Sequence, residues 1–264
     1  MRICVLASGS SGNCTLVESD SARVLLDVGI SWTRVANALA SIGVDPVSID
    51  AIIVSHEHTD HVAGVGVAAR KLRCPVYISF NTLTFAASRL KDVGREQIVL
   101  TDVGRPFSVN DIEFTAFPVP HDAVDPVGFT LKCNGLKVGI ATDLGYPTNV
   151  VRHCLGACNA LVLESNHDRR MLLSGPYPFE LKQRIASRQG HLSNEQSADL
   201  LSKVIHKDLA FVFLSHLSEE NNTPELAFNA AAEVLDKLSR RDVTLALTYR
   251  DHPSDVITIE RGVT

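Results

Sequence analysis

Three histidines and two acids lie within the six residues from His56 to His61. Neutral imidazole and carboxylate groups are ligands that divalent metals such as Zn, Mn or Fe accept in proteins. His56 and His58 alternate, so both side chains face the same way if this segment is extended. Asp60 and His61 follow at the start of a predicted helix and point toward a second position. The run therefore predicts a loop that can hold two metal ions.

The residues on either side indicate which elements hold this loop. Ile52 to Val54 is a short apolar stretch of β-branched residues, typical of a buried strand, and it stops at Ser55. Val62 to Leu72 is apolar with small residues and suits a helix. We therefore expect the run to follow the carboxyl end of a strand and to precede a helix. An ordinary solvated loop with incidental histidines is the alternative.

Three further residues of the metal-ligating kind stand where later predicted strands end. Taken alone, either histidine is more often structural, and an ordinary turn residue is the alternative for the aspartate. Together with the histidine run, they could converge at one rim of the fold and complete a metal site. These residues are His121, Asp143 and His216, after strands predicted over residues 112–118, 137–141 and 209–214.

The pattern His56-x-His58-x-Asp60-His61 after an apolar strand resembles the signature of the metallo-β-lactamase-fold hydrolases. The resemblance implies an α+β fold, an αββα four-layer sandwich, which we expect to form one domain over residues 1–264. The order of the predicted elements, which is β-rich with helices between and no linker, indicates by itself only a layered α/β or α+β protein.

The resemblance also implies how the ligands are divided between two divalent metal ions, which would be Zn, Mn or Fe. Asp143 is expected to bridge the ions. Asp27 would support the metal loop from behind, although an ordinary turn acid is the alternative for this residue. The first ion would take His56, His58 and His121, and the second Asp60, His61 and His216.

Such a metal pair lowers the pKa of bound water toward neutrality and supplies hydroxide near pH 7. A hydroxide that bridges the metals could then attack a phosphodiester in line. Asp60 and His191 are the expected catalytic residues. By the resemblance, His191 would touch the scissile phosphate or protonate the leaving oxygen, because it stands in Gly190–Ser193 before a predicted helix. A plain N-terminal helix residue is the alternative for His191.

Longer stretches resemble the YycJ/WalJ group of stand-alone nucleases of this fold. These proteins are regarded as DNA exonucleases that digest from 5′ ends, so the resemblance implies a phosphodiesterase with that activity. A cyclic phosphodiesterase or a thioester hydrolase of the same fold is one alternative, and a regulatory protein with a vestigial metal site is another. The matching stretches beyond the histidine run are Ser8–Cys14, Glu164–Asp168, Gly190–Asn194 and His216–Asn222.

A local excess of basic residues supports a nucleic-acid substrate independently. Between Arg169 and Arg188, five arginines and lysines stand against the single acid Glu180, in a chain of net charge −5. Side chains of this kind suit phosphate contacts, although a solvated helix face is the alternative. The residues expected to contact substrate are His167, Ser193, Arg169, Arg170 and Asn13.

The composition narrows the class of protein further. Hydrophobic residues make up 45 % of the chain, as in a globular protein with a core, and the net charge of −5 argues against a general nucleic-acid coat. Six scattered cysteines indicate buried, reduced thiols, and the chain begins with a strand-like stretch rather than a signal peptide. We therefore expect a cytoplasmic protein without a membrane segment, as a monomer or a dimer.

Overall fold

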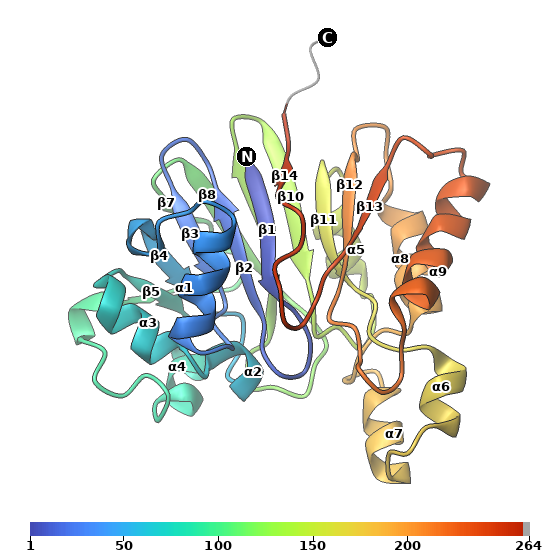
Figure 1. The fold of residues 1–264 in the computed structure, drawn as a ribbon, viewed down its shortest axis with the longest axis horizontal. Coiled ribbons are helices and arrows are strands. Elements are labelled where there is room, and N and C mark those ends of the chain that lie inside the picture. The colour runs from blue at the N-terminus through green and yellow to red at the C-terminus, as the bar shows by residue number, and fades with distance from the viewer. Residues whose placement is uncertain (261–264) are drawn as a thin grey trace.

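The computed structural model describes residues 1–260, so the last four residues of the domain expected over residues 1–264 lie outside the described residues. Within this range, two seven-stranded sheets face each other and helices lie on both outer sides (Figure 1). The predicted αββα arrangement is therefore confirmed.

In each sheet, nearly all strands that lie side by side are also consecutive along the chain. Across the first sheet the strands are β14 (Ile257–Thr258), β1 (Arg2–Ala7), β2 (Cys14–Glu18), β3 (Arg23–Leu26), β4 (Ala51–Ile53), β5 (Val76–Ile78) and β6 (Ile98–Leu100). Across the second they are β13 (Thr244–Leu247), β12 (Phe211–Ser215), β11 (Ala160–Glu164), β10 (Leu136–Ala141), β9 (Val127–Cys133), β8 (Ile112–Pro118) and β7 (Phe107–Val109).

Helices connect these strands, together with short 3-10 turns. On the side of the first sheet lie α1 (Trp32–Ser41), α2 (Thr59–Val62), α3 (Val65–Leu72), α4 (Phe80–Ala86) and the 3-10 turns η1 (Pro46–Ser48) and η2 (Arg95–Gln97). On the side of the second lie α5 (Asn149–Leu155), α8 (Asn194–Val204) and α9 (Pro224–Lys237). The short helices α6 (Arg169–Ser174) and α7 (Phe179–Ile185) extend past the edge of the second sheet, at the lower right of Figure 1.

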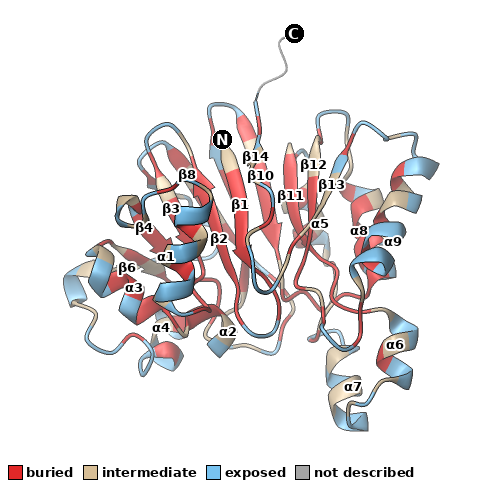
Figure 2. Ribbon diagram, viewed as in Figure 1, coloured by how far each residue is buried: buried red, intermediate tan, exposed pale blue. Residues whose placement is uncertain are grey.

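Both faces of each sheet are covered, and the strands are apolar for that reason. Along β12, Phe213 packs into the core between the sheets, while its neighbours Val212 and Leu214 pack against the helices of the second side. Leu25 of β3 likewise belongs to the core beneath the first-side helices. Successive side chains of a strand point to opposite faces, so strands covered on both sides need continuous hydrophobic runs. Figure 2 shows these strands almost entirely buried.

The direction of the strands decides where the loops with ligand-type residues meet. β3 and β4 are parallel neighbours in the first sheet, and β10, β11 and β12 are parallel in the second. β8 also runs with them, because β9 is antiparallel to both β8 and β10. Within each sheet the carboxyl ends of these strands therefore lie at one edge, the usual place for a site in sheets of this kind. The two edges meet, because His58, after β4, lies 3.2 Å from His121, after β8.

One predicted helix is divided in two. The sequence predicts a helix from residue 62 onward, whereas the structure has α2 and α3 separated at Ala63 and Gly64. The Gly64 amide donates a hydrogen bond to the Val28 carbonyl at 2.8 Å. A Cβ at Gly64 would lie 2.1 Å from the Ile30 carbonyl oxygen, so only glycine allows this close packing. The division turns α2, with Asp60 and His61, toward the rim.

Other boundaries also differ from the sequence prediction. The sequence pattern of residues 81–90 predicts a helix, whereas α4 begins at Phe80 and ends at Ala86. The sequence predicts neither of the short helices α5 and α6. Each of these two spans only six or seven residues, too few to show a helical period clearly. Among residues 1–260, no helix combines the length and the apolar character that crossing a membrane requires.

Candidate metal centre

The loop after β4 is held from behind by Asp27. The Asp27 carboxylate accepts hydrogen bonds from the Ser55 amide at 2.8 Å and from the Ser55 hydroxyl at 2.7 Å. It also accepts one from His61 Nδ1 at 2.7 Å. Asp27 is itself buried. One carboxylate therefore fixes both the start and the end of the histidine run.

His56, His58 and His121 form a first cluster. His58 Nδ1 lies 3.2 Å from His121 Nε2, and the ring centroid of His56 is 4.8 Å from that of His58 and 5.2 Å from that of His121. His56 Nδ1 is 3.0 Å from the Ser55 hydroxyl, so its Nε2 is the nitrogen that faces the cluster. These three side chains can offer ligand atoms to one metal ion.

Asp60, His61, Asp143 and His216 form a second cluster. His61 Nε2 lies 3.1 Å from Asp143 Oδ2 and 3.5 Å from Asp60 Oδ2, and His216 Nε2 lies 3.8 Å from Asp60 Oδ2. The other oxygen of Asp143, Oδ1, is 3.7 Å from His121 Nε2 of the first cluster. Asp143 thus stands between the two clusters, with one oxygen toward each.

Several buried ligand-type atoms at this centre lack a partner. Within the described part of the chain, no hydrogen bond reaches His56 Nε2, His216 Nε2 or Asp143 Oδ2. A buried polar atom without a partner costs roughly 1–3 kcal/mol, and native structures contain few of them. A divalent cation would satisfy all three, and nitrogen with carboxylate oxygen is a donor set that Zn, Mn and Fe accept. The residues therefore fit a metal.

The electrostatics of the centre favour ionised carboxylates. Burial by itself would raise the pKa of Asp143, but the neighbouring imidazoles of His216, His61 and His56 outweigh it and hold the pKa well below its usual range. The pKa of Asp60 is likewise lowered, because the neighbouring imidazoles of His216 and His61 outweigh its desolvation. Both carboxylates are therefore charged at neutral pH, as metal ligands must be.

A buried glutamate, Glu164, supports the opposite side of the centre. Its Oε1 accepts hydrogen bonds from Nδ1 of His191 and of His216, each at 2.8 Å. Its two oxygens also accept from the backbone amides of Asp143, Leu144 and Leu192, at 3.2, 2.8 and 3.0 Å. Desolvation would raise the Glu164 pKa, but His191 and His216 lower it to about 2. The position of Glu164 at the end of an apolar strand is the one local signal for this role, which the sequence alone does not assign.

Backbone conformation at the centre is unusual at three positions. Asp27, Asp143 and His216 have φ values of 58°, 54° and 59°, in the left-handed region that residues other than glycine rarely adopt. Such conformations cost on the order of 1–3 kcal/mol each, and they persist where the surrounding structure imposes them. At Asp143 and His216 they turn the side chain from the strand end into the centre.

A cavity of about 260 Å³ opens onto the centre. His58, Asp60, His121 and His216 line one side of it. His191 lines it as well, with ring centroids 5.1 Å from both His121 and His216. Since His191 Nδ1 is bonded to Glu164, Nε2 is the nitrogen left for a bound molecule. The structure thus places the His191 ring at this cavity, beside both ligand clusters.

The residues expected to contact substrate are distributed differently. His167 and Arg169 line a neighbouring cavity, and Arg170 is exposed on α6. Asn13 lies beside the second cluster, with Nδ2 3.3 Å from Asp60 Oδ2 and 3.1 Å from His61 Nε2. The expectation for Ser193 is wrong, because its side chain is fully buried and caps α8 by accepting from the Gln196 amide.

The predicted basic strip is also divided between different contacts. Arg184 lines the cavity at the metal centre, where it forms an ion pair with Asp122. Lys182 points to the other side of α7 and donates to the Leu173 carbonyl at 2.8 Å. The Arg188 guanidinium stacks over Tyr146, 4.1 Å from the ring centroid. The strip is therefore not one continuous surface, and Arg184 is the member nearest the centre.

Comparisons with known proteins agree with this geometry. A family model described as a β-lactamase superfamily domain matches residues 22–217. The chain is 37 % identical to the exodeoxyribonuclease YycJ of Bacillus anthracis, over 90 % of each chain. It is 34 % identical to the exodeoxyribonuclease WalJ of Streptococcus pneumoniae, over 93 % of this chain and 91 % of that one.

A solved structure shows the same fold at much lower sequence identity. The metallo-β-lactamase-fold protein YhfI of Bacillus subtilis superimposes with a TM-score of 0.71 at 14 % identity, covering 96 % of this chain and 98 % of its own. At that identity the likeness concerns the fold alone.

Proposed function

Because the chain belongs to the metallo-β-lactamase superfamily and to its YycJ/WalJ group, we propose that it is a DNA exonuclease with a pair of divalent metals that digests from the 5′ end. Membership of this family makes it a metal-dependent hydrolase. The relatives at 37 % and 34 % identity, which are named as exodeoxyribonucleases, support the DNA substrate.

The observation that carries the proposal is the meeting of two ligand clusters at Asp143. His56, His58 and His121 would hold one ion, the second cluster would hold the other, and Asp143 would reach both through its two oxygens. Ions bound there would lower the pKa of a water molecule toward neutrality and stabilise charge on a phosphodiester oxygen.

Residues of the chain supply the remaining parts of a phosphodiester hydrolysis. Asp60 is ionised and lines the cavity, so we assign it the task of orienting the attacking water. Glu164 accepts the hydrogen bond from His191 Nδ1 and so directs Nε2 toward the cavity. The ring that carries a proton on both nitrogens would give its Nε2 proton to the leaving oxygen and keep the one at Nδ1. Arg184 lines the same cavity beside its ion-pair partner Asp122, and its guanidinium could donate to a non-bridging phosphate oxygen there.

A location in the cytoplasm is part of the proposal. All six cysteines are free thiols in the described range, and five of them are buried. Free thiols are the usual state of cysteine in reducing compartments. The proposed substrate and the thiols therefore suit the same location.

The experiment that tests the function uses DNA labelled at one end. Protein stripped of metal is reloaded with Zn, Mn or Fe and incubated with single- and double-stranded DNA carrying the label at the 5′ or the 3′ end. We expect a 5′ label to be released at once as a mononucleotide, while a 3′-labelled strand shortens progressively. Metal content is measured on the same samples.

Two variants control this experiment. His61→Ala should lose both nuclease activity and bound metal, because it removes a ligand of the second cluster. His153→Ala changes an exposed histidine of α5 and should match the wild type. Rapid cleavage of a cyclic nucleotide or a glutathione thioester, with DNA left intact by every metal form, would reject the proposal.

A further inference from the structure

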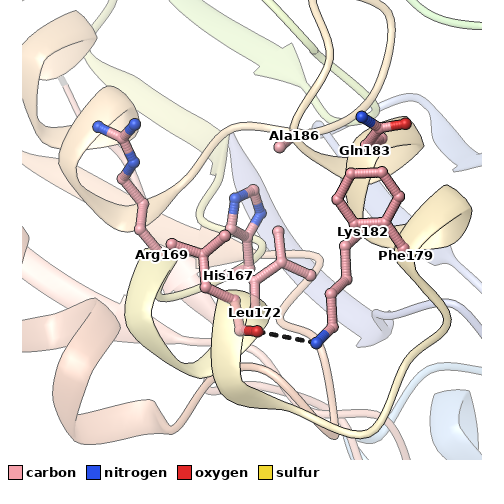
Figure 3. A pocket seen from close by; sticks show the side chains of 8 residues that line it. His167, Arg169, Leu172, Phe179, Lys182, Gln183 and Ala186 are labelled. Carbon is pink, nitrogen blue, oxygen red and sulfur yellow. Dashed lines mark hydrogen bonds between the residues drawn. The ribbon is translucent and has the colours of Figure 1, made fainter.

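A second cavity, of about 370 Å³, lies between α6 and α7 beside the metal centre (Figure 3). This volume falls within the range of small-molecule sites, which is roughly 300–1,000 Å³. Its walls are mainly apolar, with Leu172 and Leu173 from α6 and Phe179 from α7. Leu173 and Phe179 are 75 % and 67 % exposed, so two large apolar side chains stand in solvent at its margin. These two side chains give the cavity an apolar margin that a flat apolar group could cover.

Helix α7 separates this cavity from the metal centre. Its residues Leu181, Arg184 and Ile185 line the cavity at the metal centre. Phe179 and Lys182, from the other face of the same helix, line the second cavity. After β11, Asn166 lines the cavity at the metal centre, and the next residue, His167, lines the second cavity. A molecule that occupies both cavities therefore has to cross only one short helix.

A buried polar side chain faces the second cavity. His167 lines it and is 2 % exposed, and in the described part of the chain no hydrogen bond reaches its Nδ1. Figure 3 shows its ring between Arg169 on one side and Phe179 with Lys182 on the other. Burial lowers the His167 pKa to about 4, so the ring is neutral near pH 7 and offers one donor and one acceptor nitrogen.

We propose that the second cavity is a nucleobase subsite, in which one base from the end of the DNA substrate stacks on Phe179 and its edge meets His167. The sugar-phosphate chain would pass over α7 to the metal centre. This inference rests on the proposed function and deepens it, because it assigns to the protein a site that holds the strand beyond the scissile phosphate.

The chemistry of the walls favours a base over a phosphate. A phosphate needs several cationic or amide donors that converge on it, whereas the Lys182 ammonium is directed to the Leu173 carbonyl by one of its N–H groups and His167 is neutral. A base offers an apolar face and a polar edge, and aromatic side chains bind such faces with little regard to sequence. The exposed Arg169 stands at the margin, where it can contact the adjoining phosphate without entering the apolar part.

The test measures binding of a short single-stranded DNA with phosphorothioate linkages to the metal-loaded protein, by fluorescence anisotropy. Phe179→Ala should weaken binding roughly 5- to 100-fold, the effect of removing a base-stacking aromatic. In a series with a single abasic nucleotide at successive positions, one position should weaken wild-type binding by a similar factor. At that position Phe179→Ala should bind the intact and abasic strands equally.

A matched control comes from the opposite end of the molecule. Phe85 of α4 is 67 % exposed, like Phe179, and Phe85→Ala should bind as the wild type does. Equal abasic penalties in wild type and Phe179→Ala at every position, or the same loss in Phe85→Ala, would overturn the subsite and leave the proposed nuclease intact. Failure of the metal-loaded wild type to degrade unmodified DNA is a separate result, which would remove the proposed function and the subsite together.

Discussion

The histidines His61 and His216 are each held through the ring nitrogen that faces away from the cavity. Asp27 accepts a hydrogen bond from Nδ1 of His61, and Glu164 accepts one from Nδ1 of His216. A carboxylate at Nδ1 fixes the tautomer in which Nε2 keeps its lone pair, and it raises the basicity of the ring. The two acids thus prepare both nitrogens for a cation before one is bound.

Replacing Glu164 by glutamine tests this arrangement. Glutamine has nearly the same size, but it replaces one acceptor oxygen by an NH₂ group, so it cannot accept all five hydrogen bonds of Glu164. We expect Glu164→Gln to reduce metal affinity and activity roughly 10- to 100-fold, as for other supports of metal ligands. Metal titration and steady-state kinetics on DNA measure both quantities.

The control for this variant is Glu225→Gln, which changes an exposed glutamate in the first turn of α9. It should leave metal affinity and kinetics unchanged. Equal behaviour of the two glutamine variants would show that Glu164 does not orient His191 and His216.

Packing between short segments places α2, and with it Asp60 and His61. The backbone N–H of Asn13 donates to the Asp60 carbonyl at 2.7 Å, and the backbone N–H of Val28 donates to the His61 carbonyl at 2.9 Å. Gly29 lies against the same helix, where a Cβ would be 1.6 Å from the Asp60 carbonyl oxygen. The position of the second cluster therefore depends on a glycine distant from it in sequence.

Gly29→Ala should displace α2 and damage the second cluster. Overpacking of this kind costs roughly 1–3 kcal/mol of unfolding free energy. We also expect loss of the metal ion that Asp60 and His61 would hold, because the added methyl group pushes on the Asp60 backbone. Denaturant unfolding and metal analysis are the measurements.

Gly156→Ala serves as the matched substitution. Gly156 has a φ of −61° at the end of α5, and its nearest neighbours to a new Cβ are 3.4 Å away. Its unfolding free energy should stay within about 0.5 kcal/mol of the wild type. Retention of both metals in Gly29→Ala would show that the position of α2 does not depend on Gly29.

The metal centre lies between the two halves of the sandwich. The histidine run follows β4 of the first sheet, whereas His121, Asp143 and His216 follow strands of the second. The sheets also share one core, which includes Ile53 of β4 and Phe213 of β12. We therefore propose that the chain is a single domain. The shared apolar core holds the two sheets together, and bound metals would join them a second time at the rim.

Removing the metals should lower the unfolding temperature without dividing the transition. A ligand present at 100 times its Kd stabilises a protein by about 2.7 kcal/mol, and for a protein of roughly 150–250 residues each kcal/mol shifts Tm by about 2–4 °C. We expect EDTA to lower Tm by about 5–10 °C in scanning calorimetry. The signal should remain a single transition, because the shared core unfolds as one unit.

His61→Ala should show little further change with EDTA, since it already lacks a ligand. Two separate transitions in metal-free wild type would argue against a single domain. An unchanged Tm after verified metal removal would argue against ligands drawn from both sheets.

The local part of the site could be predicted from the sequence. His56, His58, Asp60 and His61 lie within one short loop, and the apolar strand before them places that loop without knowledge of distant contacts. The three remaining ligand-type residues could be proposed because each follows an apolar strand. The layered fold followed from the same alternation of strands and helices together with the resemblance.

Only the tertiary structure decided how distant segments use their side chains. Glu164 gains its role from His191, His216 and three amides that reach it from other strands and loops, while Ser193 loses its expected role because it caps a buried helix. The left-handed backbone of Asp143 and His216 and the two faces of α7 have no local signature either. Ligand types and strand ends are properties of neighbouring residues, whereas burial, partners and backbone strain arise only when segments far apart in the chain pack together.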